Sequence, residues 1–283
     1  MNVHAEVPSS PSAELRFRRP IKPLAALREL WQARDLLRAL VERQLRARYK
    51  QAFLGFAWAL IPSVTMMLVL TLFVQKAVTI ETGGVPYPLF SFVALLAWNF
   101  FASSISGASG SLVGNISLLN KVYCPREVFP VSTTITAGVD AILGLSVLTI
   151  LFVIHTFVPK ATVVWVPVLL VVLAAFTLGV VLIMSSLTVY LRDLRHVLPM
   201  ITQLGLLATP IAYGMNKIPE NLRVPYSAVN PLAPVIDGLR RTILLGQQPA
   251  WDMLAAGATT SFLLLGVGFI LFKKLETGFT DVA

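Results

Sequence analysis

The amino-acid sequence predicts an all-α integral membrane protein with about six transmembrane helices, and three observations support this fold class. Hydrophobic residues make up 56% of the 283 residues and charged residues only 13%, whereas about a quarter of a typical soluble chain is charged. Several separate windows each hold the roughly 20 apolar residues that a helix needs to cross a hydrocarbon core of about 30 Å. Basic residues gather between these windows, as is typical of loops that face the cytoplasm.

The chain starts with a basic segment. Residues 1–51 contain 11 Lys and Arg and five Asp and Glu, which gives 11 − 5 = +6 of the formal net charge of +9. A pI near 10 is also typical of nucleic-acid-binding proteins, but a basic segment beside a hydrophobic span favours membrane lipids, and no nucleic acid, as the partner. Residues 1–30 are expected to form a flexible basic cytoplasmic tail. They lack the apolar core and the cleavage site of a signal peptide, so we expect no cleavage there.

Residues 31–50 are expected to form an amphipathic interface helix. Apolar residues recur at spacings of three and four, at Leu37, Leu40, Val41 and Leu45, and mainly charged residues cover the other face. An ordinary surface helix would show the same pattern. The position directly before a span, together with a basic polar face, favours a helix in the plane of the cytoplasmic headgroups.

Six hydrophobic windows follow and define a transmembrane domain, residues 51–283. They cover about 52–74, 87–113, 128–154, 163–190, 197–210 and 253–272. The connectors after the second, fourth and sixth windows each carry two basic residues, whereas those after the first and third carry one lysine each. The positive-inside bias therefore predicts that both termini lie in the cytoplasm.

Residues 213–250 break this regular pattern. The stretch alternates apolar patches with proline and glycine, and neither half is long enough to span a bilayer. Short interrupted segments at membrane depth are tolerated where protein or a water-filled cavity shelters the backbone, which predicts two re-entrant helices between the fifth and sixth spans. A long outer loop is the alternative. The predicted topology places the stretch outside although it holds Lys217, Arg223, Arg240 and Arg241.

The residues needed for catalysis are absent from the sequence. The chain has no GxxxxGK[ST] phosphate loop, no GxSxG nucleophile motif and no HExxH zinc motif. One cysteine, Cys124, and three scattered histidines give no ligand spacing, so we expect no catalytic residue, no metal site and no cofactor bound directly to this chain. Energy for transport would come from an ion gradient or from another subunit.

Asp140 is the ionisable residue that lies near the middle of a predicted span. Ion-coupled carriers usually hold several such groups at mid-membrane. A single carboxylate favours pairing across a helix interface, or lining a polar lumen, over proton coupling.

Four segments carry distinctive local motifs. A basic Arg-Tyr-Lys block precedes a Leu-Gly-x-x-Trp span in 40–74, and an Asn-Lys-x-x-x-Pro-Arg-Glu core lies in 115–131. The segment 190–219 begins with Tyr-x-Arg-Asp and also contains Thr-Pro-Ile-x-Tyr. The segment 230–246 begins with Asn-Pro-x-x-Pro. In this order the motifs resemble those of type 2 ABC transporter permeases that export O-antigen, capsular polysaccharide or teichoic acid. Cys124 departs from the pattern, because an aromatic or other apolar residue is common there.

The resemblance implies the channel subunit of an ATP-driven ABC exporter, which moves a lipid-linked polysaccharide out of the cytoplasm across a bacterial inner membrane. It implies a homodimer flanked by two copies of an ATPase subunit, with ATP and Mg bound to that partner. It also implies that residues 115–127 include a coupling segment that contacts the ATPase. The residues expected to serve this coupling are Asn120, Lys121, Tyr123, Pro125, Arg126 and Glu127.

Two further sets of residues are expected to meet the lipid-linked glycan. Basic and aromatic residues of the interface helix would suit a diphosphate headgroup, although they also act as topology signals; they are Arg43, Arg46, Arg48, Tyr49 and Lys50. Aromatic rings near span ends are mostly interfacial anchors, but such rings also stack on sugars. The channel or gate candidates are Phe56, Trp58, Trp98, Asp140, Tyr213 and Asn216.

Two other functions stay open on the sequence alone. An ABC exporter of drugs or small lipids would share the spans but not the full set of motifs in 115–131 and 190–219. An ion-coupled carrier would need no ATPase, and its transport would be abolished by Asp140→Asn.

Overall fold

A computed structural model describes residues 23–49, 57–75, 80–115 and 124–279 of the chain. Within these ranges the chain forms helices and connecting turns, with no strand. Five helical segments are long and apolar enough to cross a membrane, which confirms the predicted all-α membrane fold. They are Ala57–Val74, Tyr87–Ser111 (α5), Val128–Ile154 (α7), Ala161–Tyr190 and Trp251–Gly278. The first consists of α3, Ala57–Val69, and a π-helical turn η2, Leu70–Val74. The fourth consists of a 3-10 turn, Ala161–Trp165, and α8, Val166–Tyr190, and the last of α12, Trp251–Leu275, and a 3-10 turn, Glu276–Gly278.

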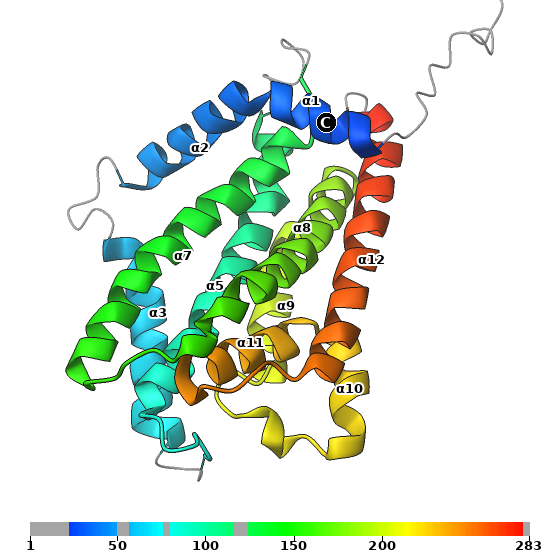
Figure 1. Ribbon diagram of the computed structural model, residues 1–283. Helices are drawn as coiled ribbons and strands as arrows, with labels where there is room; N and C mark the ends of the chain where they lie inside the picture. Colours follow the sequence, from blue (N-terminus) through cyan, green and yellow to red (C-terminus); the bar gives the residue numbers. More distant parts are fainter. Residues whose placement is uncertain (1–22, 50–56, 76–79, 116–123, 280–283) are drawn as a thin grey trace, which may run out of the picture.

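Helix α5 forms the centre of the bundle. It packs against α3, α7 and α8 and against the shorter helices α9 and α11 (Figure 1). Most of its residues are buried within the single chain, including Leu89, Phe92 and Ala94 at no more than 1% exposure. Small residues allow the closest contact between two other helices, α8 and α12. A Cβ added at Gly268 would lie 2.5 Å from the carbonyl oxygen of Gly179, so neither position has room for a side chain.

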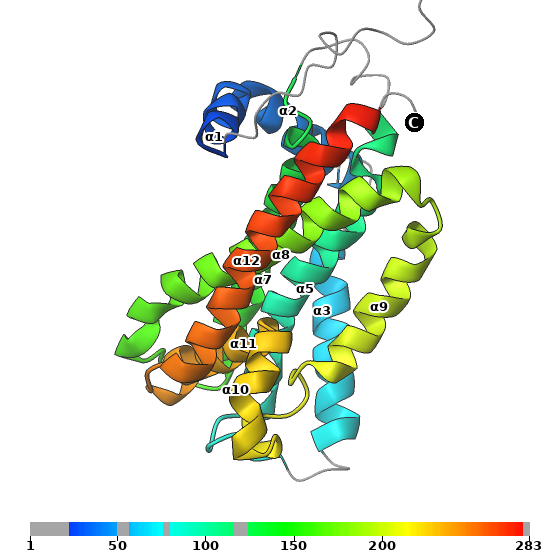
Figure 2. The same ribbon diagram turned by 90° about the vertical axis from the view of Figure 1, so that its right-hand side faces the viewer.

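The fifth predicted window corresponds to α9, Leu194–Ala208, which has only 15 residues. At 1.5 Å per residue it is about 22 Å long, shorter than a hydrocarbon core. Thr209 has an extended backbone and Pro210 follows it, so the helix ends there. Five helices therefore meet the length of a span, and the sixth crossing stays a prediction. Figure 2 shows α9 along the outside of the bundle. Its residues Met200, Leu204 and Leu207 are exposed.

Two short helices occupy the region between α9 and α12. They are α10, Glu220–Val229, and α11, Leu232–Arg240, which continues into the π-helical turn η6, Arg241–Leu245. Helix α11 is almost entirely buried and contacts α5, α8 and α12, whereas α10 is largely exposed. Two helices therefore lie where the sequence predicts them. Their depth in a bilayer stays a prediction.

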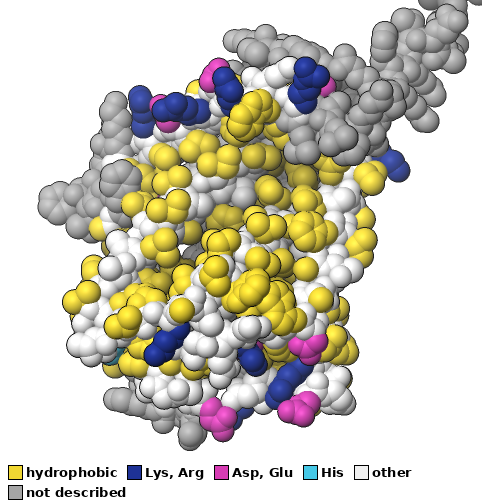
Figure 3. Space-filling view, viewed as in Figure 1, with side chains coloured by type: hydrophobic (Ala, Val, Ile, Leu, Met, Phe, Trp, Pro, Cys, Tyr) yellow, Lys and Arg dark blue, Asp and Glu magenta, His cyan; other side chains and the backbone are white. Residues whose placement is uncertain are grey.

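The bundle has two distinct ends (Figure 1). We call the "α2 end" the one formed by α1 (Pro23–Gln32), α2 (Arg34–Tyr49), residues 124–127 and the last turns of α12, and the "α11 end" the opposite one, with α10 and α11. Charged side chains gather at both edges of the face in Figure 3, and hydrophobic side chains cover the zone between them. This distribution is that of a membrane protein with two polar rims.

Helix α1 overlaps the end of the expected flexible tail at 1–30, since a regular helix begins at Pro23; residues 1–22 of that tail lie outside the described residues. Proline is favoured in the first turn of a helix, where its missing N–H costs nothing. Leu30 then packs in a cluster with Leu40, Phe272 and Phe279, so the helix is tied to the α2 end of the bundle.

Candidate functional site

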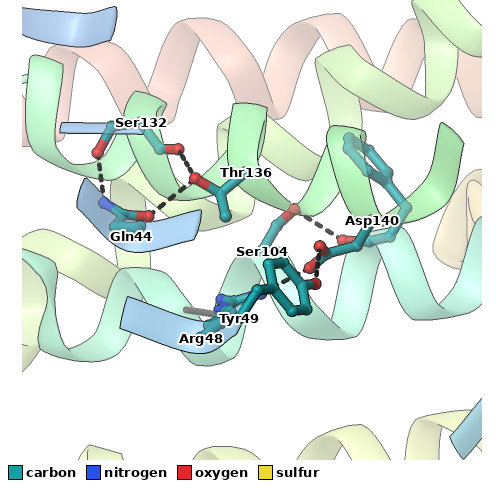
Figure 4. A network of polar contacts seen from close by, with 8 residues as sticks. Gln44, Arg48, Tyr49, Ser104, Ser132, Thr136 and Asp140 are labelled. Atoms are coloured by element: carbon teal, nitrogen blue, oxygen red, sulfur yellow. Dashed lines mark hydrogen bonds and ion pairs between the residues drawn. The ribbon is translucent and has the colours of Figure 1, made fainter. Parts of the chain in front are cut away.

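Helix α2 is joined to the first half of α7 by polar contacts rather than by apolar packing alone. Gln44 Nε2 donates a hydrogen bond to Ser132 Oγ at 2.9 Å, and Thr136 Oγ1 donates to Gln44 Oε1 at 3.0 Å (Figure 4). One turn further along both helices, Arg48 meets Asp140. The two helices therefore run side by side in the same direction, with matched polar residues on the faces that touch.

Asp140 is the centre of this contact. Its Oδ2 accepts a hydrogen bond from Arg48 Nη1 at 2.6 Å, and its Oδ1 accepts one from Tyr49 OH at 2.6 Å (Figure 4). The Asp140 side chain is 16% exposed and that of Arg48 is 41% exposed. Burial, and then the hydrogen bond to Asp140, raise the pKa of Tyr49 to about 12. The expected pairing of Asp140 across a helix interface is present in the structure.

The residues expected to meet a lipid headgroup thus divide into two groups. Arg48 and Tyr49 are held by Asp140, and Arg43 donates to the side-chain oxygen of the buried Asn115. Arg46 instead faces outward with its side chain 73% exposed, beside Glu42 at 3.3 Å. Lys50 lies outside the described residues.

The described part of the expected coupling segment, residues 124–127, is tied to the last helix of the same chain. Glu127 is 2% exposed and forms an ion pair with Lys273 of α12. Lys273 Nζ also lies 3.0 Å from Glu276 Oε2. Arg126 donates to the backbone carbonyl of Glu276 and lies over the ring of Phe279 at 5.8 Å. Two residues expected to contact the ATPase therefore hold the entry to α7 against the end of α12.

The rest of the coupling set is only partly visible. Pro125 opens the turn into α7, because its carbonyl accepts a hydrogen bond from Val128 N at 3.2 Å. Burial raises the pKa of the neighbouring Cys124 thiol. Asn120, Lys121 and Tyr123 lie outside the described residues.

At the α11 end, Arg240 is fully enclosed. Its guanidinium donates to the carbonyls of Phe90 at 3.0 Å, Pro210 at 2.7 Å, Ile211 at 2.6 Å and Tyr213 at 3.0 Å. The same group stacks on the Phe90 ring at 3.6 Å. Arg240 therefore fastens the turn after α9 to α5 and α11. Its place in an apolar run of α11 was the only sequence signal for this role.

The arginine also accounts for part of the excess positive charge in 213–250. Arg240 is buried among carbonyls, Arg241 Nε lies 2.6 Å from Asp237 Oδ2, and Arg223 lies 3.4 Å from Glu220. Three of the four basic residues that conflict with the predicted topology therefore have an oxygen partner within the region.

The channel or gate candidates occupy three separate places. Trp58 and Asp140 line a cavity of about 360 Å³ between α2, α3, α5 and α7. Tyr213 donates to Ala208 O at 3.2 Å and Asn216 donates to Glu81 at 2.7 Å, both at the α11 end. Trp98 is only 4% exposed in the core of the single chain, beside Phe101 and Gly205. Phe56 lies outside the described residues.

Within the part of the chain that the structure describes, no three metal-ligating side chains come together. The arrangement instead offers helix contacts, a polar cavity and two tied ends.

Comparison with known proteins identifies the family. Residues 35–244 match the model of the family described as ABC-2 type transporter. The chain is 31% identical over 257 residues to an O-antigen export system permease protein RfbA of Myxococcus xanthus, covering 90% of this chain and 98% of that protein. It is 26% identical over 251 residues to two proteins of the same name from Klebsiella pneumoniae, covering 88% of this chain and 95% of each. The chain belongs to the ABC-2 type transporter family.

Proposed function

We propose that this chain is the membrane-spanning channel subunit of an ATP-driven exporter that carries a lipid-linked polysaccharide of the O-antigen type out of the cytoplasm. The observation that carries the proposal is similarity over 98% of the length of an O-antigen export permease. Five helices of span length, with a buried central helix α5, provide the membrane domain that such a subunit needs.

The proposal includes a partner that supplies the energy. Because the sequence lacks a nucleotide-binding phosphate loop, ATP and Mg would bind to a separate ATPase subunit. We expect a homodimer of this chain with two such subunits at the α2 end, and both termini in the cytoplasm of an inner-membrane protein. The contacts between residues 124–127 and α12 support this placement. Because of them, a displacement of that end by the ATPase would be transmitted directly to two spans, α7 and α12.

The structure also bears on the ion-coupled alternative. A proton carrier needs a carboxylate that can give up its partners during each cycle. Asp140 instead accepts short hydrogen bonds from both Arg48 and Tyr49. These contacts favour a structural role for Asp140.

The test is a deletion of the gene in the bacterium that encodes it. Polysaccharide should disappear from the cell surface and accumulate as lipid-linked polymer inside, and a plasmid copy should restore export. A plasmid copy combined with an ATPase whose phosphate-loop lysine is replaced should not restore it. Unchanged surface polysaccharide, together with greater sensitivity to drugs, would instead identify a small-molecule exporter.

A further inference from the structure

Helix α2 contacts both flanks of the expected coupling segment, residues 115–127. The chain before this segment is the end of α5 and a 3-10 turn, Val113–Asn115, and the chain after it is the start of α7. Three residues of α2 reach these flanks: Leu40, Arg43 and Gln44. Residues three and four positions apart lie on the same face of a helix. One face of α2 therefore meets both flanks.

Arg43 makes the contact before the segment. Its Nη2 donates a hydrogen bond to the side-chain oxygen of Asn115, the first residue of the segment. Asn115 is buried, and its own Nδ2 donates to the carbonyl of Ser111 at 2.7 Å. This second bond orients the amide, so that its oxygen is held toward Arg43. Without Arg43, the buried oxygen would lose its described partner, which is unfavourable.

Gln44 makes the contacts after the segment. Its amide bridges two hydroxyl groups one turn apart on α7, since Nε2 donates to Ser132 Oγ at 2.9 Å and Oε1 accepts from Thr136 Oγ1 at 3.0 Å (Figure 4). Ser132 and Thr136 are both fully buried. A shift of α2 along α7 would break the two bonds together, so the amide fixes the position of α2 on α7.

Apolar packing supports these polar contacts. Leu40 is 3% exposed, and it belongs to a cluster that includes Leu112 before the segment and Val128 and Phe129 after it. A single face of α2 thus bonds to and packs against the ends of both α5 and α7. Separation of these two ends would break contacts of α2 with at least one of them.

We propose that α2 is a clamp across the expected coupling segment, and that Arg43 and Gln44 are positioning residues for the transmission of movement from the ATPase. If the two flanks could separate, a push on the segment would be spent on separating them. Because one helix holds both flanks, the ends of α5 and α7 move together, and α2 moves with them. Arg48 and Tyr49 extend this hold one turn further along α7, to Asp140. The inference rests on the proposed function.

The test compares export with ATP hydrolysis in the complex of this chain with its ATPase. Inverted membrane vesicles that contain the lipid-linked polysaccharide give the amount moved per ATP hydrolysed, and the purified complex gives the amount of ATPase bound. Gln44→Ala removes both bonds to α7, and Asn115→Ala removes the acceptor of Arg43 while Arg43 itself stays in place. Arg38→Gln is the matched control, since Arg38 lies on α2 with its side chain 80% exposed and pairs with Glu42 of the same helix.

We expect Gln44→Ala and Asn115→Ala to bind the ATPase and hydrolyse ATP at the wild-type level. They should move about fivefold less polysaccharide per ATP, which is the lower end of the usual range of coupling between distant sites. Arg38→Gln should leave this ratio unchanged. The double variant Gln44→Ala/Ser132→Ala should be no worse than Gln44→Ala, because the bond between the two side chains can be lost only once.

Two results would overturn the clamp. One is a wild-type ratio of export to ATP hydrolysis in both Gln44→Ala and Asn115→Ala. The other is a loss of bound ATPase in proportion to the loss of export, because the contacts would then serve only folding or assembly. A role in coupling lowers the ratio in complexes that are fully assembled.

Arg43 needs a comparison of its own, because it also belongs to the residues expected to meet a lipid headgroup. The clamp requires Arg43→Ala and Asn115→Ala to lower the ratio alike, and their combination to be no worse than either. A loss in Arg43→Ala alone would overturn the assignment of Arg43 and indicate the headgroup role. If the wild-type complex exports polysaccharide and the variants match it, only the clamp is wrong; if the wild-type complex exports none, the proposed function is wrong and the clamp falls with it.

Discussion

Removing Lys273 should destabilise the α2 end more than removing its partner Glu127. Lys273→Met leaves Glu127, at 2% side-chain exposure, and Glu276, at 22%, without their shared cation. Breaking a buried ion pair in this way costs about 3–5 kcal/mol. Glu127→Gln leaves Lys273 paired with Glu276 at 3.0 Å, so its cost should be nearer that of one imperfect buried hydrogen bond, about 1–3 kcal/mol.

The double variant Glu127→Leu/Lys273→Met is the informative one. It removes both charges of the buried pair, and replacement of a buried pair by apolar groups is often close to neutral. Arg126 still donates to the Glu276 backbone in that variant and stays near its carboxylate. Measured against the single variants Glu127→Leu and Lys273→Met, the double variant should therefore be non-additive by about 3 kcal/mol or more.

Thermal unfolding of the detergent-solubilised protein measures these differences. At about 2–4 °C per kcal/mol for a chain of this size, Lys273→Met should lower the Tm by roughly 6–20 °C, and the double variant should recover most of that loss. Additive effects, or a Glu127→Gln variant less stable than Lys273→Met, would refute the assignment of the buried pair. Should the double variant be stable but hydrolyse ATP without exporting polysaccharide, the pair also carries the coupling between the two activities.

Three other predictions concern separate parts of the fold. Arg240→Lys keeps the positive charge but replaces the guanidinium with an ammonium, whose three N–H donors cannot reach all four carbonyls. The free energy of unfolding should therefore fall by roughly 2–3 kcal/mol in the same assay, and an unchanged Tm would contradict this role. Gly268→Ala should lower the Tm or the yield of folded protein because its Cβ meets the Gly179 carbonyl, whereas the control Gly266→Ala, with nothing within 4 Å, should not. The Cys124 thiol should react with N-ethylmaleimide more slowly than free cysteine at pH 7.5, since burial raises its pKa and reduces the thiolate fraction, and its rate should still be rising at pH 9; a rate at pH 7.5 equal to that of free cysteine would show the thiol to be solvated.

Local composition was enough to predict the spans. A run of apolar residues is helical in a membrane because the backbone has no other way to satisfy its hydrogen bonds. Four of the predicted windows accordingly coincide with helices of span length to within a few residues, and the described part of the first window does so too. The fifth window has enough apolar residues in sequence, but Thr209 and Pro210 end α9 after 15 residues. Hydropathy averages over a window and does not register such a stop.

Contacts between distant residues were harder to predict. The expected helix at 31–50 has an apolar stripe, and Gln44 lies within it, yet nothing nearby in the sequence identifies Ser132 and Thr136 as its partners. The same holds for Arg240, whose four acceptors are backbone carbonyls that every residue possesses. Arg126 and Glu127 illustrate a third case: their charge predicted contacts with an ATPase, and the contacts that the structure describes are with Lys273 and Glu276 of the same chain. The ATPase contact stays a prediction.

The tie between Arg126 and the end of α12 has a consequence for how the protein is made. The two contacting residues are 150 positions apart in the chain. At about 5–20 residues per second, the ribosome needs roughly 7–30 s to deliver Glu276 after Arg126 has emerged. Lys273 arrives at the same late stage, so the neighbouring Glu127 lacks its described ion-pair partner during this interval. The α2 end is therefore the last part of the bundle to close during biosynthesis, and a ribosome stalled before α12 would leave a chain whose other spans are inserted while this end is still open.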